Sequence, residues 1–282
     1  MLRFCLLFSL LLYAGISSAQ KRERILIDEG WKFMRYSGTP DNLVYDARPE
    51  VANKNDNIVA DTRAADTGRA KASGEVLKSW ILPVANDFIK DRSKHYQRPA
   101  GDPGSDFAFV QTDFNESSWA SVDLPHDWAA KGPFYKGADA IVGGGMGRLP
   151  IQGVAWYRRK LDITKADQGK SIYLEIDGAM SYAMVWLNGK LVGGWPYGYN
   201  SFQLNLTQYL NYAGENQLAI RLDNPNYSAR WYPGAGLYRH VWLSKLSPVH
   251  VAQWGTFIHT RNVSANSATI DLTAALQPFR SC

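Results

Sequence analysis

The chain reads QLAIRLDNPNYSARWYPGAGLYRHVW over Gln217–Trp242, and this stretch decides its fold. In its first part Leu218, Ile220 and Leu222 alternate with small or polar residues. Neighbouring side chains of a strand point to opposite faces, so this alternation predicts a strand with one buried face. A second alternating run follows over 237–243. We therefore expect two strands that are joined by a loop.

The loop between these two strands carries aromatic and cationic side chains. It contains Arg230, Trp231 and Tyr232 ahead of a Pro-Gly pair. A tryptophan face stacks on the apolar face of a sugar ring, and a guanidinium offers hydroxyl groups a rigid fork of donors. These three residues are therefore our candidates for carbohydrate contact. In the alternative interpretation, Trp231 and Tyr232 cover the end of a sandwich and Arg230 is solvated.

The chain on both sides of this stretch is typical of an all-β protein. Short apolar or alternating runs recur at Val154–Leu161, Ser171–Ile176, Tyr182–Leu187 and Ser201–Asn205. Asn188-Gly189 is a strong signal for a tight hairpin turn. No sustained helical period is visible. Short strands separated by turns predict a β-sandwich.

The strand pattern is interrupted twice. Residues 37–104 are rich in Asp, Asn, Ala, Arg and Lys, with one short helix expected over 84–95. We interpret them as a long surface insertion and expect them to be the most mobile internal part. Alternation restarts after 247, and one hairpin cannot bury a core of its own. The sequence therefore predicts a first domain over 20–247 and an incomplete second sandwich over 248–282.

Residues 1–19 have the pattern of a secretory signal peptide. Arg3 precedes an apolar run over Phe4–Ala14, and Ser17–Ala19 supplies the small residues of a cleavage site. Removal of this leader leaves Cys282 as the one cysteine, so we expect no internal disulfide. The sequence thus predicts a secreted or periplasmic protein that is stabilised by its core.

Charge and motifs argue against several classes of function. The net charge of +5 is scattered, with one tight cluster at 21–24, so we expect neither a nucleic-acid nor a membrane partner. The glycine run over 143–147 lacks the Lys-Ser/Thr ending of a phosphate-binding loop. The histidines lack metal-ligand spacing, and no pair of carboxylates stands out for glycoside hydrolysis. We therefore expect no catalytic residue, metal ion or cofactor in this chain.

His126 and Asp127 are adjacent and could act as a base and its orienting carboxylate. Adjacent residues of an extended strand point to opposite faces, however, so they form no dyad without a bend. We interpret the pair as structural, tying a strand end to a neighbouring loop.

Four motifs occur in order along the chain. They are LPHDW at Leu124–Trp128, GVAWYRR at Gly153–Arg159, VWLNGK at Val185–Lys190 and WYPGAGLYR at Trp231–Arg239. Together they resemble the N-terminal region of glycoside hydrolase family 2, in the style of β-galactosidase-like enzymes of Bacteroidetes-type polysaccharide degraders. The resemblance implies a jelly-roll, galactose-binding-like β-sandwich to about Ser247, followed by the start of an immunoglobulin-like β-sandwich.

The resemblance also implies that both catalytic glutamates lie in a TIM barrel beyond the second sandwich. The sequence ends before such a barrel, so we expect a truncated or frameshifted product that hydrolyses no glycoside. In some family members an aspartate of the loop before Gly-x-Tyr-Arg contacts the sugar, and here Arg230 stands near that position.

Three functions remain open at this point. The chain is the non-catalytic sugar-binding front end of a secreted glycosidase, a stand-alone carbohydrate-binding module, or a structural accessory domain. The expected partner in the first two is a carbohydrate.

Overall fold

The computed structural model describes residues 22–46, 74–134, 136, 149, 152–225 and 234–277. The chain divides into two compact units, each described here by itself. The larger comprises Arg24–Gln168 and Ile172–Ser244, and the smaller comprises Lys245–Cys282 with Met1–Glu23 and Gly169–Ser171. Among the described residues, no helix combines the length and the apolar character needed to cross a membrane.

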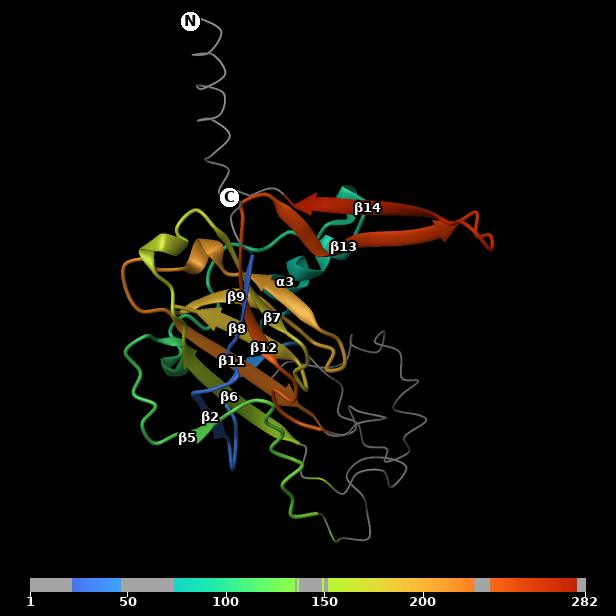
Figure 1. Ribbon diagram of the computed structural model, residues 1–282. Coiled ribbons are helices and arrows are strands. Elements are labelled where there is room, and N and C mark those ends of the chain that lie inside the picture. Colours follow the sequence, from blue (N-terminus) through green and yellow to red (C-terminus); the bar gives the residue numbers. More distant parts are fainter. Residues whose placement is uncertain are drawn as a thin grey trace, which may run out of the picture. The chain divides into compact units, whose positions relative to one another are not determined.

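Two antiparallel sheets form the sandwich (Figure 1). The six-stranded sheet consists, in spatial order, of β5 (Ala120–Val122), β2 (Trp31–Arg35), β6 (Gly153–Lys160), β11 (Gln217–Asn224), β8 (Ala183–Leu187) and β9 (Lys190–Trp195). The four-stranded sheet consists of β1 (Glu23–Leu26), β12 (Val241–Leu246), β7 (Ser171–Ile176) and β10 (Phe202–Asn205). The predicted all-β sandwich is confirmed. β1 and β2 follow each other in the chain but lie in different sheets.

The core lies between the two sheets and follows the alternation of the sequence. Leu218, Ile220 and Leu222 of β11 belong to one apolar cluster with Leu174 of β7 and Leu243 of β12. These side chains are almost fully excluded from solvent. Burying a Leu or Ile side chain contributes about 1.5–3 kcal/mol, so this cluster supplies most of the force that holds the sheets together.

The opposite face of β11 is buried as well, which the alternation did not predict. All 8 residues of β11 are buried. A second cluster covers this face and includes Ala219 of β11, Trp156 of β6 and Trp186 of β8. Its outer side includes Leu43 of β3 (Leu43–Val44), Ile81 of α3 (Lys78–Ile81) and Val110 of the 3₁₀ helix η5 (Ala108–Val110). The same part of the chain also forms β4 (Glu75–Val76) and the 3₁₀ helices η3 (Leu82–Phe88) and η4 (Arg92–Lys94). We call these elements the cover layer.

The cover layer changes the interpretation of residues 37–104. Its buried residues Leu43, Leu77 and Ile81 pack into the second cluster, so the described parts of this segment belong to the fold rather than to a loose surface loop. Sequence reasoning missed this packing because Leu43, Leu77 and Ile81 lie in or beside a two-residue strand and a single helical turn, which are too short to show a periodic pattern. The single 3₁₀ turn η5 likewise places Val110 in this cluster. The boundaries of the predicted insertion stay a prediction.

A buried ion pair joins the cover layer to β11. Arg221 Nε donates to Asp41 Oδ1 at 2.9 Å, and both side chains are 1% exposed. The other oxygen of Asp41 accepts from Trp156 Nε1 at 2.9 Å. A desolvated carboxylate is tolerated when its lone pairs are used in this way. The pair therefore fixes where the chain around Asp41 meets the sheet.

The remaining described elements are short or belong to the smaller unit. The 3₁₀ helices η7 (Lys165–Asp167) and η8 (Thr207–Tyr209) connect strands of the sandwich. The smaller unit contains an antiparallel hairpin of β13 (His250–Arg261) and β14 (Thr269–Gln277). Because two described strands do not make a sandwich, the immunoglobulin-like fold and the boundary at 247 stay predictions.

Replacing Asp41 by Ala should lower the free energy of unfolding strongly, because Arg221 would stay buried without its carboxylate. Breaking a buried pair by removing one partner costs about 3–5 kcal/mol. The matched control is Glu215→Ala, which removes the exposed pair with Lys160, 2.7 Å apart. An exposed pair is worth less than about 1 kcal/mol. Urea unfolding of the two variants and the parent measures the difference, and equal losses would contradict the assigned role of Asp41.

Candidate functional site

The candidate sugar-contacting residues Arg230, Trp231 and Tyr232 lie outside the described residues, so their contact with carbohydrate stays a prediction. The structure does describe the chain on both sides of 226–233. We use the name loop base for the residues that hold these two sides together: His126, Asp127, Tyr157, Met180, Ser181, Asn224 and 234–237.

Asn224 joins the two sides of the loop directly. Its Nδ2 donates to the carbonyl oxygen of Gly234 at 2.9 Å. The Ser181 hydroxyl lies 3.2 Å from Asn224 Oδ1 and 3.1 Å from the carbonyl oxygen of Asp223. Asn224 and Ser181 are buried, and a buried polar group that loses its partner costs free energy. This network therefore holds the two ends of the loop at a fixed separation.

The LPHDW motif forms the other side of the loop base. The backbone N–H of His126 donates to the carbonyl of Leu237 at 2.8 Å. Asp127 Oδ1 accepts from the backbone N–H groups of Ala129 at 2.8 Å and Ala235 at 3.1 Å. The carboxylate thus links its own turn to the returning end of the loop. The prediction that His126-Asp127 ties a strand end to a neighbouring loop is confirmed.

Gly236 is required where these segments meet. Its φ of +117° lies in a region that other residues rarely adopt. A Cβ at this position would lie 2.3 Å from the carbonyl oxygen of His126 and 2.7 Å from Tyr157 Oη. Its backbone also exchanges two hydrogen bonds with Met180, of 2.9 and 3.0 Å. The glycine therefore lets three segments approach one another at backbone distance.

A buried histidine–tyrosine pair lies under Gly236. His126 Nδ1 and Tyr157 Oη are 2.7 Å apart. Burial lowers the pKa of His126, and Lys131 lowers it further while Asp127 opposes both. Burial also raises the pKa of Tyr157. Both groups are therefore neutral near pH 7, and one hydrogen bond joins the Tyr157 hydroxyl to Nδ1 of the imidazole.

A shallow recess of about 440 Å³ opens beside the LPHDW motif. It is lined by Ser121, Val122, Asp123, Pro125, His126, Asp127, Ala130 and Lys131. Asp127 is already used by backbone N–H groups, so its negative charge is directed into the fold. The residues that the structure describes contain no group of three or more His, Cys, Asp or Glu side chains that could hold a metal ion.

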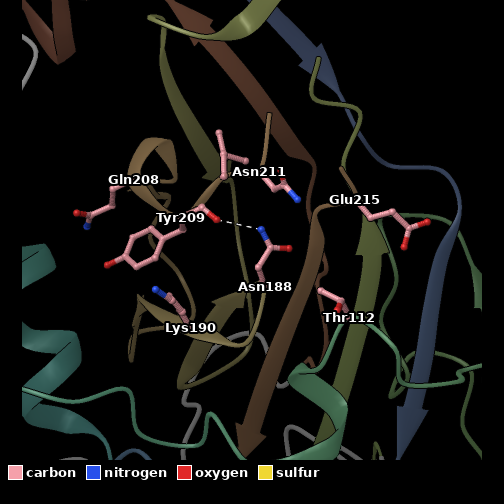
Figure 2. A pocket seen from close by; sticks show the side chains of 8 residues that line it. Thr112, Asn188, Lys190, Gln208, Tyr209, Asn211 and Glu215 are labelled. Carbon is pink, nitrogen blue, oxygen red and sulfur yellow. Dashed lines mark hydrogen bonds between the residues drawn. The ribbon is translucent and has the colours of Figure 1, made fainter. Parts of the chain in front are cut away.

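A second recess of about 440 Å³ lies at the other end of β11 (Figure 2). Its lining residues are Thr112, Asn188, Lys190, Gln208, Tyr209, Leu210, Asn211 and Glu215. Asn188 Nδ2 donates to the carbonyl of Tyr209 at 2.9 Å and to Asn216 Oδ1 at 3.0 Å. The side chain of Asn188 therefore joins its hairpin turn to the chain that carries Tyr209 and Asn216, which is a structural role.

Sequence reasoning missed one group of exposed aromatic residues. Tyr197 and Tyr199 follow β9 in the run Trp-Pro-Tyr-Gly-Tyr, and Tyr197 is 56% exposed. The signal was available, because two tyrosines on either side of a glycine directly after a strand are typical of a displayed loop. The pattern does not show, however, that Pro196 and Gly198 are anchored on both sides of the Tyr197 ring.

Comparison with known proteins agrees with this geometry. Residues 150–235 match the profile of the family described as glycosyl hydrolase 2 galactose-binding domain-like. Beta-galactosidase BoGH2A of Bacteroides ovatus is 42% identical over 174 residues, which cover 61% of this chain and 20% of that protein. A putative beta-glucuronidase of Formosa agariphila is 34% identical over 170 residues, covering 60% of this chain and 16% of that protein.

Solved structures share the fold. A beta-glycosidase from Bacteroides vulgatus superposes with a TM-score of 0.60 at 24% identity, covering 91% of this chain and 24% of that chain. A glycosyl hydrolase family 2 member from Bacteroides cellulosilyticus gives 0.57 at 25% identity, covering 90% and 24%. Residues 150–235 are thus similar to the galactose-binding-like domain of glycosyl hydrolase 2 proteins, and the described sandwich has the fold of solved family 2 structures. It spans about a fifth of the length of the curated relatives it matches.

Replacing Asp127 by Ala should loosen the loop base, because backbone N–H groups on both segments lose their acceptor. Hydrogen bonds to a charged group contribute about 1.5–3 kcal/mol, so the free energy of unfolding should fall by about 2 kcal/mol. Asp127→Asn keeps an acceptor oxygen and should lose less. Urea unfolding measures both, with the exposed Asp106→Ala as control. An Asp127→Ala variant as stable as the control would contradict this role.

The His126–Tyr157 pair should make stability depend on pH. Since burial holds the folded pKa of His126 below its ordinary value of 6.5, the unfolded chain takes up the proton first as pH falls. The stability that the neutral, buried His126 contributes is complete above about pH 6.5. It is lost as the pH falls from there through the folded pKa. Comparing unfolding at pH 7.5 and 5.5 in the parent and in His126→Gln isolates it. The variant should lose less on acidification, and identical losses would rule out His126 as the cause.

Proposed function

We propose that this chain provides the non-catalytic sugar-binding part of a secreted family 2 glycoside hydrolase with β-galactosidase-like activity. The observation that carries the proposal is the loop base, whose buried contacts hold both ends of 226–233 against the sandwich. A sugar-contacting loop needs such support, because binding is weakened when the contacting groups must be ordered first. Residues 150–235, which include this loop, match the galactose-binding-like family, and two relatives of the chain are named as a beta-galactosidase and a putative beta-glucuronidase.

In this proposal the loop supplies recognition and another domain supplies the chemistry. Trp231 and Tyr232 offer aromatic faces to a sugar ring, and Arg230 offers donors to its hydroxyl groups. Glycoside hydrolysis needs two carboxylates that face the scissile bond. We assign those to a domain joined to this sandwich in the whole enzyme. The natural partner of the chain is then a β-glycoside held between the two domains.

We also propose that the protein is exported to the periplasm or the medium. The support is the sequence of residues 1–19, in which a positive start, an apolar run and small residues follow one another.

The test replaces the matching N-terminal region of BoGH2A by residues 20–247 and measures hydrolysis of nitrophenyl β-galactoside. In this fusion, Arg230→Ala and Trp231→Ala should each lower kcat/KM about tenfold, or about 1.4 kcal/mol, with little change in Tm. Arg92→Ala, an exposed arginine of the cover layer, is the matched control and should change neither.

Two outcomes would contradict the proposal. A large fall in Tm with unchanged kcat/KM would make Arg230 and Trp231 packing residues, as expected of a structural accessory domain. Strong sugar binding by the unfused chain would instead favour a stand-alone carbohydrate-binding module, because a half-site with one stacked ring and a few exposed bonds barely offsets the entropy of association.

A further inference from the structure

A group of four exposed or half-buried side chains lies beside the loop base. We call it the tyrosine–arginine patch: Tyr197, Tyr199, Tyr238 and Arg239. The rings of Tyr197 and Tyr199 are 5.4 Å apart with an angle of 60° between their planes. In such an edge-on contact the edge of one ring meets the face of the other. The ring that presents its edge therefore has neither of its faces covered by its partner. Tyr197 is 56% exposed.

The patch lies at the same end of the sandwich as the loop base. β9 ends at Trp195, which pairs with Ala183 at the start of β8. The neighbouring backbone N–H of Tyr182 donates to the carbonyl of Pro196 at 3.0 Å. Met180 pairs with Gly236 of the loop base. The residues that follow β9 and those that follow 226–233 therefore flank the same short segment, 180–183.

The backbone around Tyr197 is held on both sides. Pro196 is fixed by Tyr182, and the carbonyl of Gly198 accepts from Tyr238 Oη at 2.9 Å. Gly198 is buried, and a Cβ there would lie 2.2 Å from Met180 Sδ. The loop is thus rigid at its centre while its tyrosine ring faces solvent. A ring presented in this way loses little entropy when it binds, because few torsions remain to be fixed.

Arg239 adds a cation to the patch. Its Cδ and the ring of Tyr238 both lie within 3 Å of where a Cβ on Gly178 would be, so the two side chains share one small site on the surface. Burial raises the pKa of Tyr238, and the charge of Arg239 opposes that rise, which agrees with their proximity. Arg239 is exposed, and its guanidinium has no hydrogen-bond or ion-pair partner among the residues that the structure describes.

An exposed tyrosine ring together with an exposed guanidinium has the chemistry of a saccharide contact. The apolar face of a pyranose stacks on a tyrosine, and vicinal hydroxyl groups accept from two N–H donors of an arginine. A protein partner would be expected to meet a broader apolar surface than one tyrosine pair. We propose that the tyrosine–arginine patch binds a further sugar unit of a β-linked substrate, beyond the terminal unit that the parent enzyme cleaves. This inference rests on the proposed function and extends it from one sugar unit to two.

The test uses two substrates that differ in length, in the same fusion with BoGH2A. Nitrophenyl β-galactoside has one sugar unit, and β-1,4-galactotetraose extends beyond it. Tyr197→Ala and Arg239→Gln should each lower kcat/KM for the tetrasaccharide about five- to tenfold and leave that for the nitrophenyl substrate unchanged. The controls are Tyr96→Ala, a tyrosine 45% exposed, and Arg92→Gln. They should change neither value.

The outcomes separate this inference from the proposed function. If Arg230→Ala and Trp231→Ala lower both activities but Tyr197→Ala lowers neither, the patch proposal fails and the proposed function stands. Equal losses on both substrates with a lower Tm would make the patch a packing surface, which overturns the inference. If the fusion is inactive, saturation-transfer NMR of the whole chain with galactotetraose decides. Transfer that disappears in Tyr197→Ala and persists in Tyr96→Ala supports the patch, and any other pattern rejects it.

Discussion

The burial of β11 on both faces is the constraint on which the rest of the structure depends. One face needs the four-stranded sheet, and the other needs the cover layer, so neither can be removed without exposing the centre of the fold. Arg221 illustrates this constraint. Its guanidinium is buried on the outer face of β11, and a buried charge is tolerated there only because Asp41 pairs with it. β11 ends at Asn224, which bonds to Gly234 across the loop. The loop base is therefore anchored directly to the most deeply buried strand.

The loop base holds both ends of the loop that we propose as the sugar contact. Asp127 and Gly236 are not reacting groups, and their task is to place backbone segments close together. Groups that contact a ligand act well only when a supporting set of residues holds them, which gives the LPHDW and GAGLYR motifs a physical purpose. The tyrosine–arginine patch uses the same support through Met180 and Tyr238. Both candidate sugar contacts therefore depend on one set of buried hydrogen bonds.

Much of the fold could be predicted because strand alternation is local. Leu218, Ile220 and Leu222 face the core as expected, and Asp127 ties two segments as expected. The cover layer could not be predicted, since the residues of α3 and η5 enter the core from turns whose apolar spacing has no period. Tyr197 was missed for a different reason: nothing local shows that Pro196 and Gly198 are both anchored and that the ring between them is displayed.

The sequence by itself determined which residues prefer strands, where turns fall and which family motifs occur, because these depend on neighbours within a few positions. Only the tertiary structure decided which strands pair and which polar groups are buried together. Asp41 meets Arg221 across 180 positions of sequence, and β1 and β2 separate into different sheets although they are adjacent in the chain. Such contacts form because the whole apolar surface must be covered at once and every buried charge must be paired, and both conditions apply to the folded molecule as a whole.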